Sequence, residues 1–188
     1  MSIPDPSSRS TYEDWLQLEG NWELIEGKLY NMTPAPSSNH QFAVGELYFA
    51  LRSFFQNRDC YVFTSPFDVY LSENEDYDRP NQIIQPDLAV VCNKNKIVSK
   101  GCQGAPTLIV EVLSPSTALK DYNEKFDLYQ RFGIDEYWIV DTANKMVHIY
   151  NHLKDGIYTA RTTYGEHDIL KSIIFAELSI SLQSVFAL

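Results

Sequence analysis

Two acidic residues stand in otherwise apolar segments, and they are the strongest candidates for chemistry in this chain. Glu111 lies within Leu108-Ile-Val-Glu-Val-Leu113, as one carboxylate among five aliphatic side chains. Burying an unpaired charge is costly, so such a residue must be paired, protonated or bound to a metal. The alternative is that Glu111 faces solvent from an edge strand. Aliphatic neighbours on both sides of it instead indicate a strand that is covered on both faces.

Asp87 opens a second apolar segment, Pro86-Asp-Leu-Ala-Val-Val91. An Asp after Pro is also common at a turn or at the start of a strand, so this residue alone is a weak signal. If the two apolar segments form neighbouring strands, the carboxylates of Asp87 and Glu111 converge, and a divalent cation relieves their repulsion. Oxygen-rich, partly hydrated sites of this kind suit Mg²⁺ or Mn²⁺.

Lys125 is the candidate positive group. Apolar spacing predicts a helix over residues 118–132, whose core-facing arc also contains Asp121 and Lys125. One interpretation pairs these two residues at the margin of the arc, with the lysine stem covering apolar surface. The other interpretation points Lys125 at the strand of Glu111, where its charge positions or activates a water.

The order of helices and strands predicted around these residues indicates an α/β (mixed α+β) fold, with a sheet flanked by at least two helices. We expect residues 1–10 to be a flexible N-terminal arm and residues 11–188 to be a single domain. Helices are predicted at residues 11–16, 39–56 and 118–132. Strands are predicted at residues 22–32 (a hairpin), 61–71 (bent at Pro66), 83–92, 107–113, 136–141, 145–150, 156–163 and 170–175, with a loop at residues 93–105.

The charge of the chain is strongly acidic but unevenly distributed. There are 15 Lys and Arg against 25 Asp and Glu, a net charge of −10. Residues 1–78 carry 4 basic and 13 acidic side chains, or −9, whereas residues 79–188 carry 11 and 12, or −1. An acidic protein is a poor general binder of nucleic acid, because phosphate contacts need Lys and Arg. However, the candidate residues lie in the nearly neutral part, so a phosphate-bearing substrate is not excluded.

Cysteine usage and hydropathy predict a cytoplasmic protein. Cys60, Cys92 and Cys102 are an odd number without a CxxC or Cys/His ligand spacing, so we expect neither a disulfide framework nor a structural zinc. No apolar run approaches the ~18–20 residues of a membrane helix. The N-terminus also lacks the apolar core of a signal peptide.

Four segments occur in an order and spacing that resembles a known group of proteins. They are Gln85-Pro-Asp-Leu-Ala-Val-Val, Ala105-Pro-Thr-Leu-Ile-Val-Glu-Val-Leu-Ser-Pro-Ser-Thr, Asp121-Tyr-Asn-Glu-Lys-Phe-Asp-Leu-Tyr and Gly133-Ile-Asp-Glu-Tyr-Trp-Ile-Val-Asp. Further matching features are Tyr12-Glu-Asp-Trp-Leu, the hairpin Glu23-Leu-Ile-Glu-Gly-Lys-Leu, the turn Pro34-Ala-Pro and His40. Together they resemble the PD-(D/E)xK nuclease superfamily. Most closely they resemble a large bacterial family of restriction-endonuclease-like proteins that was formerly a domain of unknown function.

This resemblance implies a restriction-endonuclease-like fold and metal-dependent hydrolysis of DNA phosphodiester bonds. Asp87 and Glu111 would then be the motif acids that bind Mg²⁺ or Mn²⁺. The sequence departs from the pattern at the motif lysine, because Leu113 stands two residues after Glu111. Lys125 fits the place of a catalytic lysine that has migrated to the following helix.

Two residues near the first long helix are secondary candidates. Glu46 is either an additional metal or water ligand or a solvated helix residue, and His40 either caps the helix or enters the site. A homodimer is compatible with the many aromatic residues, but nothing in the sequence establishes one.

Two other functions compete with a nuclease. A catalytically silent relative that binds protein or nucleic acid is favoured by Leu113 and by the net charge of −10. A glycosidase with two carboxylates accounts for the paired acids but leaves Lys125 unexplained.

Overall fold

The computed structural model describes residues 9–32 and 36–188. Most of the predicted N-terminal arm, residues 1–8, and residues 33–35 of the predicted proline turn lie outside the described residues. The helices are α1 (Tyr12–Leu16), α2 (Ser38–Phe54), the 3₁₀ turn η1 (Lys94–Lys96), α3 (Ala118–Tyr122), α4 (Glu124–Arg131) and α5 (Leu182–Val185). The strands are β1 (Trp22–Ile25), β2 (Lys28–Asn31), β3 (Tyr61–Thr64), β4 (Asp68–Leu71), β5 (Gln82–Ile84), β6 (Leu88–Val91), β7 (Ile97–Val98), β8 (Gly101–Gln103), β9 (Leu108–Val112), β10 (Glu136–Asp141), β11 (Met146–Lys154), β12 (Ile157–Gly165), β13 (Ile169–Lys171) and β14 (Ser179–Ser181).

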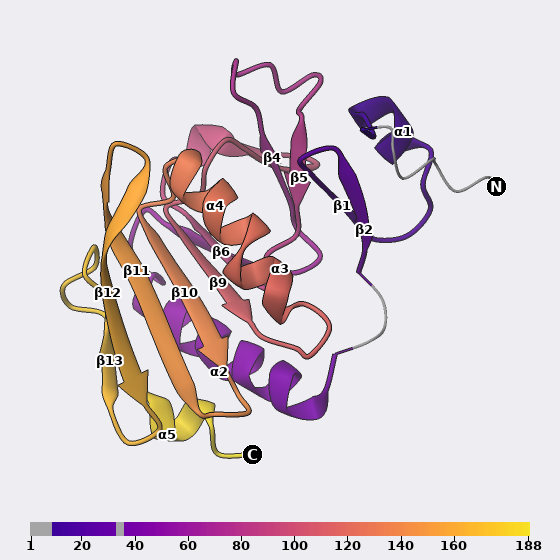
Figure 1. Ribbon diagram of the computed structural model, residues 1–188. Coiled ribbons are helices and arrows are strands. Elements are labelled where there is room, and N and C mark those ends of the chain that lie inside the picture. Colours follow the sequence, from indigo (N-terminus) through magenta and orange to yellow (C-terminus); the bar gives the residue numbers. More distant parts are fainter. Residues whose placement is uncertain (1–8, 33–35) are drawn as a thin grey trace.

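A six-stranded sheet in the order β12-β11-β10-β9-β6-β3 forms the centre of the molecule. Strands β9 and β10 are parallel, and the other neighbours in this sheet are antiparallel. Helix α2 covers one face of the sheet, and α3 and α4 cover the other (Figure 1). Side chains alternate along a strand. Accordingly, Val110 of β9 packs in the same core cluster as Leu47 of α2, whereas Ile109 packs with Leu128 of α4.

A second six-stranded sheet, in the order β2-β1-β5-β4-β8-β7, adjoins the face that carries α4. Ile25, Val69 and Ile84 of this sheet share one buried core cluster with Ile109 and Tyr129. The chain passes from the second sheet to the central one between β5 and β6, through residues 85–87. The predicted mixed α+β fold is therefore confirmed.

Several predicted elements differ from those observed, among them the strand over residues 61–71, which is divided into β3 and β4 in different sheets. The helix over residues 118–132 is divided into α3 and α4 by Asn123, whose backbone is not helical (φ −117°, ψ −82°). The strand over residues 83–92 is two strands in different sheets, and the loop over residues 93–105 contains η1, β7 and β8. Such short strands are defined by their partners, as β8 is by parallel pairing with β4, and local sequence carries little of that information.

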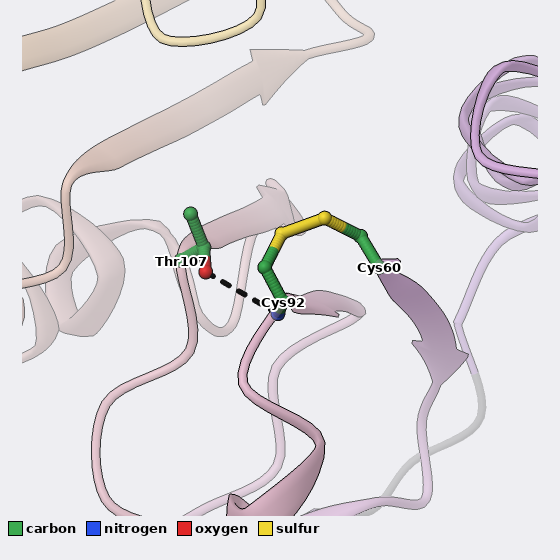
Figure 2. Close-up of a disulfide and its surroundings, with 3 residues drawn as sticks. All are labelled: Cys60, Cys92 and Thr107. Atoms are coloured by element: carbon green, nitrogen blue, oxygen red, sulfur yellow. Dashed lines mark hydrogen bonds between the residues drawn. A yellow bond between two sulfur atoms is a disulfide. The ribbon is translucent and has the colours of Figure 1, made fainter. Parts of the chain in front are cut away.

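The expectation of no disulfide was wrong. Cys60 and Cys92 are joined by a disulfide, with their Cα atoms 4.0 Å apart (Figure 2). They directly flank the antiparallel strands β3 and β6, in which Tyr61 pairs with Val91. The backbone N–H of Cys92 donates a hydrogen bond to the Thr107 hydroxyl at 3.4 Å. Because disulfides are rare in reducing compartments, this bond runs against the expected cytoplasmic location, which stays a prediction.

Across the described ranges, 9–32 and 36–188, no helix combines the length and apolar character needed to cross a membrane.

Candidate active site

The structure brings Asp87 and Glu111 together at the ends of two neighbouring strands. Strands β6 and β9 are antiparallel, with Leu88 opposite Val110, so the next position along the register places Asp87 opposite Glu111. The carboxylate oxygen Oδ2 of Asp87 accepts a hydrogen bond from the backbone N–H of Val112 at 2.7 Å. The register thus places the two residues on neighbouring strands as expected, and the shared cation site stays a prediction.

Lys125 lies in the first turn of α4, and its side chain reaches Glu111. Its Nζ is 2.7 Å from Oε1 of Glu111, 2.8 Å from Oε1 of Glu23 and 3.9 Å from Oδ1 of Asp121. The Lys125 side chain is only 1% exposed, and its carboxylate neighbours raise its pKa well above the ordinary value although burial acts to lower it. Both interpretations of Lys125 thus hold in part, but its contact with Glu111 is the shorter one.

Glu111 is held by two donors on one oxygen. Lys125 and the Tyr129 hydroxyl both donate to its Oε1, the latter at 2.6 Å. Tyr129 is placed by α4, one helical turn after Lys125, so both donors come from the same face of that helix. The second oxygen of Glu111, Oε2, takes part in neither bond.

Glu23 is a site residue that the sequence argument missed. It is fully buried in β1, pairs with both Lys120 and Lys125, and accepts a hydrogen bond from the backbone N–H of Gln85 at 2.9 Å. Burial acts to raise the pKa of Glu23, but the two lysines outweigh it and lower the pKa. The signal was available, because Glu23 is a charge inside the apolar strand Trp22–Ile25, as Glu111 is in its own strand.

His40 reaches the site, whereas Glu46 does not. His40 lies in the first turn of α2, is 7% exposed, and places Nε2 3.3 Å from Oδ2 of Asp87. The helix cap belongs instead to Ser37, whose side chain accepts from the backbone N–H of His40. Glu46 lies off the buried stripe of α2, which includes Ala43 and Leu47. No hydrogen bond or ion pair joins Glu46 to the cluster within the described part of the chain.

The cluster contains more carboxyl groups than ammonium groups, and two of its carboxyl groups ionise less readily than usual. Four carboxyl groups face two ammonium groups; these are Glu23, Asp87, Glu111 and Asp121 against Lys120 and Lys125. Burial raises the pKa of Glu111 to about 8, Lys125 acts in the opposite direction, and Asp121 and Asp87 add to the rise. Burial likewise raises the pKa of Asp121. A bound divalent cation would favour the ionised form of these two carboxyl groups.

The donor set fits a hard divalent cation. No three His, Cys, Asp or Glu side chains gather at metal-binding spacing among the residues that the structure describes. Mg²⁺ does not require such a cage, because it commonly binds one or two carboxylates together with waters and substrate phosphates. Asp87 and Glu111 could supply those carboxylates. Oδ1 of Asp121, buried and without a hydrogen-bond partner in the described chain, is a further unsatisfied acceptor at the site.

A mixed sheet with helices on both faces is the architecture expected of the restriction-endonuclease-like class of proteins. Residues 9–183 match the model of the Uma2 family, described as "Putative restriction endonuclease", and the chain belongs to this family. The crystal structure of a "putative nuclease belonging to DUF820" from Anabaena variabilis has the same fold, with a TM-score of 0.75. The two chains are 19% identical, and the match covers 94% of this chain and 97% of that one.

Two relatives from Synechocystis sp. are similar over most of the chain, and both are called uncharacterized proteins. One is 27% identical over 156 residues, covering 80% of this chain and 78% of the relative. The other is 28% identical over 148 residues, covering 77% of this chain and 80% of the relative. The family assignment expected from the sequence is therefore confirmed, and it supports a nuclease.

Proposed function

We propose that this protein is a metal-dependent endonuclease that hydrolyses DNA phosphodiester bonds. Asp87 and Glu111 hold Mg²⁺ or Mn²⁺, and Lys125 serves as the migrated lysine of the site. One observation carries the proposal: the strand register places Asp87 opposite Glu111, and Lys125 lies 2.7 Å from Glu111. When bound, the cation stabilises developing negative charge and lowers the pKa of water.

Neighbouring residues of this chain orient the two carboxylates that would bind the cation. The Val112 N–H and His40 hold one oxygen of Asp87, and Lys125 and Tyr129 hold one oxygen of Glu111. Preorganised contacts of this kind keep the ligand oxygens in place without reorganisation during reaction. Each carboxylate retains a second oxygen outside these bonds, which is available to a cation.

Lys125 acts mainly through Glu111 in this arrangement. Its buried ammonium offsets the carboxylate charge that gathers around the reacting phosphate. A lysine at the position of Leu113 would extend from the same strand as Glu111. Lys125 instead reaches Glu111 from α4, and in this proposal it takes the place of the lysine that is missing at position 113.

Plasmid DNA incubated with the protein and Mg²⁺ or Mn²⁺ tests this function. We expect cutting by the wild type. Asp87→Asn and Glu111→Gln should each reduce cutting at least about 100-fold, the scale of losing one preorganised electrostatic contact. Glu177→Gln is the matched control, because Glu177 is an exposed carboxylate whose ion pair with Arg58 lies outside the cluster. Cutting that persists in both cluster variants would assign it to a contaminant or to another site.

A catalytically silent binding module is the second candidate, favoured by the absence of lysine at position 113. Calorimetry with Mg²⁺ and Mn²⁺ separates the two functions. A nuclease should bind the cation in a manner that Asp87→Asn abolishes, whereas a decayed site should show little binding that depends on Asp87.

A further inference from the structure

A cavity of about 400 Å³ lies beside the segment of chain that leads into Asp87. Gln85 lines it and lies two residues before Asp87 in the chain. Phe63 and Phe67, also in its wall, flank the bend at which the Ser65 N–H donates to the Asp87 carbonyl at 3.1 Å. This volume is at the lower end of the range for small-molecule sites, so the cavity suits one planar group.

Two stacked aromatic rings form part of the cavity wall. The rings of Phe63 and Phe67 stack with centroids 4.0 Å apart and planes within 1° of parallel. Both residues are half-buried, so part of this surface remains accessible. Successive bases of single-stranded nucleic acid stack on side chains of this type.

The polar wall of the cavity contains an acceptor that lacks a donor. Gln85 is 5% exposed, and its Nε2 donates to Oδ1 of Asp68 at 2.7 Å. The other oxygen of Asp68 accepts from the Tyr70 hydroxyl at 3.1 Å. Oε1 of Gln85 has no hydrogen-bond partner among residues 9–32 and 36–188. Because buried acceptors are normally satisfied, this oxygen favours a ligand that brings an N–H group.

The charge of the cavity differs from that of the catalytic cluster. Its ionised side chains are one carboxylate, Asp68, and one ammonium group, Lys100, among the lining residues. Asp68 is already satisfied by Gln85 and Tyr70, so the interior favours a neutral ligand over an anion or a metal ion. Lys100 is exposed and could pair with a phosphate attached to that ligand.

We propose that this cavity binds an unpaired nucleobase of the DNA strand whose phosphodiester bond is cut at Asp87 and Glu111, a role that rests on the proposed function. The base stacks on the outer face of the Phe63–Phe67 pair and donates an N–H from its edge to Oε1 of Gln85. Adenine, cytosine and guanine present amino groups of this kind. An enzyme that takes a base out of the duplex needs such a pocket to hold it.

The structure also connects the cavity with the cluster. The backbone N–H of Gln85 donates to Glu23, which pairs with Lys125, which in turn pairs with Glu111. A base in the cavity therefore contacts the residue that helps to hold Glu23. The catalytic carboxylates and the base site are thereby fixed relative to each other.

Binding of small probes in EDTA tests the cavity without any need for cleavage. The probes are the four 2′-deoxynucleoside 5′-monophosphates and 2-deoxyribose 5-phosphate, which has the same phosphate but no base. NMR titration of the wild type should show at least one nucleotide binding about 5- to 100-fold more tightly than the baseless phosphate, the range expected for one stacked base. The Gln85 side-chain amide signals should shift with the tighter probe. Equal affinities, or shifts confined to other residues, would overturn the proposal.

Two matched variants locate the effect. Phe67→Ala should remove the preference for the nucleotide, whereas Phe49→Ala should retain it, because Phe49 is 69% exposed on α2 and does not line the cavity. Equal losses in both variants would contradict the proposed site. The wild-type comparison of probes stands even if Phe67→Ala fails to fold.

The outcome separates this proposal from the proposed function. A base preference in a protein that cuts no DNA with Mg²⁺ or Mn²⁺ would support the cavity and reject the nuclease. If the wild type cuts DNA but shows no base preference, the nuclease is supported and the base site is rejected.

Discussion

At the level of single residues, Lys125 balances the buried charges of the site. It is 1% exposed and lies within 4 Å of three carboxylates, from Glu23, Glu111 and Asp121. A lysine in such a position is stabilised only by its partners, since desolvation alone would favour its neutral form. The same residue therefore serves the fold and the proposed chemistry.

Removing Lys125 should destabilise the fold far more than removing an exposed cation. We expect Lys125→Met to lower the free energy of unfolding by about 3–5 kcal/mol, because it leaves buried carboxylates without a partner. Arg131→Met is the control, since Arg131 pairs with Glu26 and Glu73 at 44% exposure, and it should cost about 0–1 kcal/mol. Urea denaturation at neutral pH measures both, and similar losses would contradict the buried ion cluster.

His40 and His148 should have pKa values on opposite sides of 6.5, the ordinary pKa of a histidine side chain. Burial acts to lower the pKa of His40, but its contact with Asp87 outweighs this and raises the pKa. Burial and then Arg161 lower the pKa of His148. Protonated His40 thus stabilises the fold below about pH 6.5, and this contribution is lost as pH rises through its folded pKa. The contribution of neutral His148 is present above about pH 6.5 and is lost as pH falls through its folded pKa.

NMR titration of the imidazole protons in metal-free protein measures both pKa values. Asp87→Asn should lower the pKa of His40, because burial then acts without the opposing carboxylate, and should leave His148 unchanged. A His40 pKa that does not respond to Asp87→Asn would show that their contact is absent in solution.

At the level of elements, the passage between the two sheets determines the geometry of the site. Residues 85–87 leave β5 in one sheet and enter β6 in the other, so Gln85 lines the cavity while Asp87 faces Glu111. The opposite wall depends on the pairing of β4 with β8, in which Gly101 lies beside Asp68. Gly101 has φ +149°, and a Cβ there would lie 2.1 Å from the Asp68 carbonyl oxygen.

Substituting Gly101 should disturb this pairing, whereas substituting a helical glycine should not. We expect Gly101→Ala to lower the free energy of unfolding by at least about 1–3 kcal/mol, the cost of a strained backbone. Gly45→Ala, in α2 with no atom within 4 Å of its added Cβ, should raise it by about 0.5–1 kcal/mol. Thermal and urea unfolding of the two variants provide the measurement. A neutral Gly101→Ala would mean that β4 and β8 do not pair as observed.

At the level of the whole molecule, the net charge of −10 disfavours strong binding to phosphates. The first 78 residues carry −9 of that charge. The strands and helix of the cluster lie mainly in the nearly neutral remainder, although Glu23 and His40 come from the acidic part. With only 15 Lys and Arg, the proposed DNA affinity would have to come largely from a bound cation and from the proposed base site. Assembly into a homodimer stays a prediction.

Metal-free binding to random-sequence duplex DNA should therefore be weak. In EDTA at physiological salt we expect a Kd no tighter than about 10⁻⁴ M, the weak end of non-specific binding. The logarithm of affinity should also depend only slightly on the logarithm of salt concentration, because few phosphates are neutralised by Lys or Arg. Fluorescence anisotropy across a salt series measures both quantities. Tight binding with a steep salt dependence would contradict this expectation, because it would indicate many contacts between phosphates and Lys or Arg.

The sequence by itself was sufficient for the fold class, the family and the Asp87–Glu111–Lys125 combination. A carboxylate inside an apolar strand, or a lysine on the apolar arc of a helix, differs from its immediate sequence neighbours. Such a residue can therefore be recognised from a short stretch of sequence. The roles proposed for these three residues stay predictions. Glu23 carried the same local signal, but only its contacts with Lys120 and Lys125 distinguish it as part of the cluster.

Tertiary structure alone decided the features that join distant residues. The disulfide connects cysteines 32 positions apart, and the Glu23–Gln85 hydrogen bond spans 62 positions. The division of residues 83–92 between two sheets, and the cavity that results, depend on strand pairing across the molecule. Strand pairing is set by packing against non-local neighbours, so local propensity contains little of it. For that reason the acids could be found from the sequence, whereas the cavity that we propose as a base site required the fold.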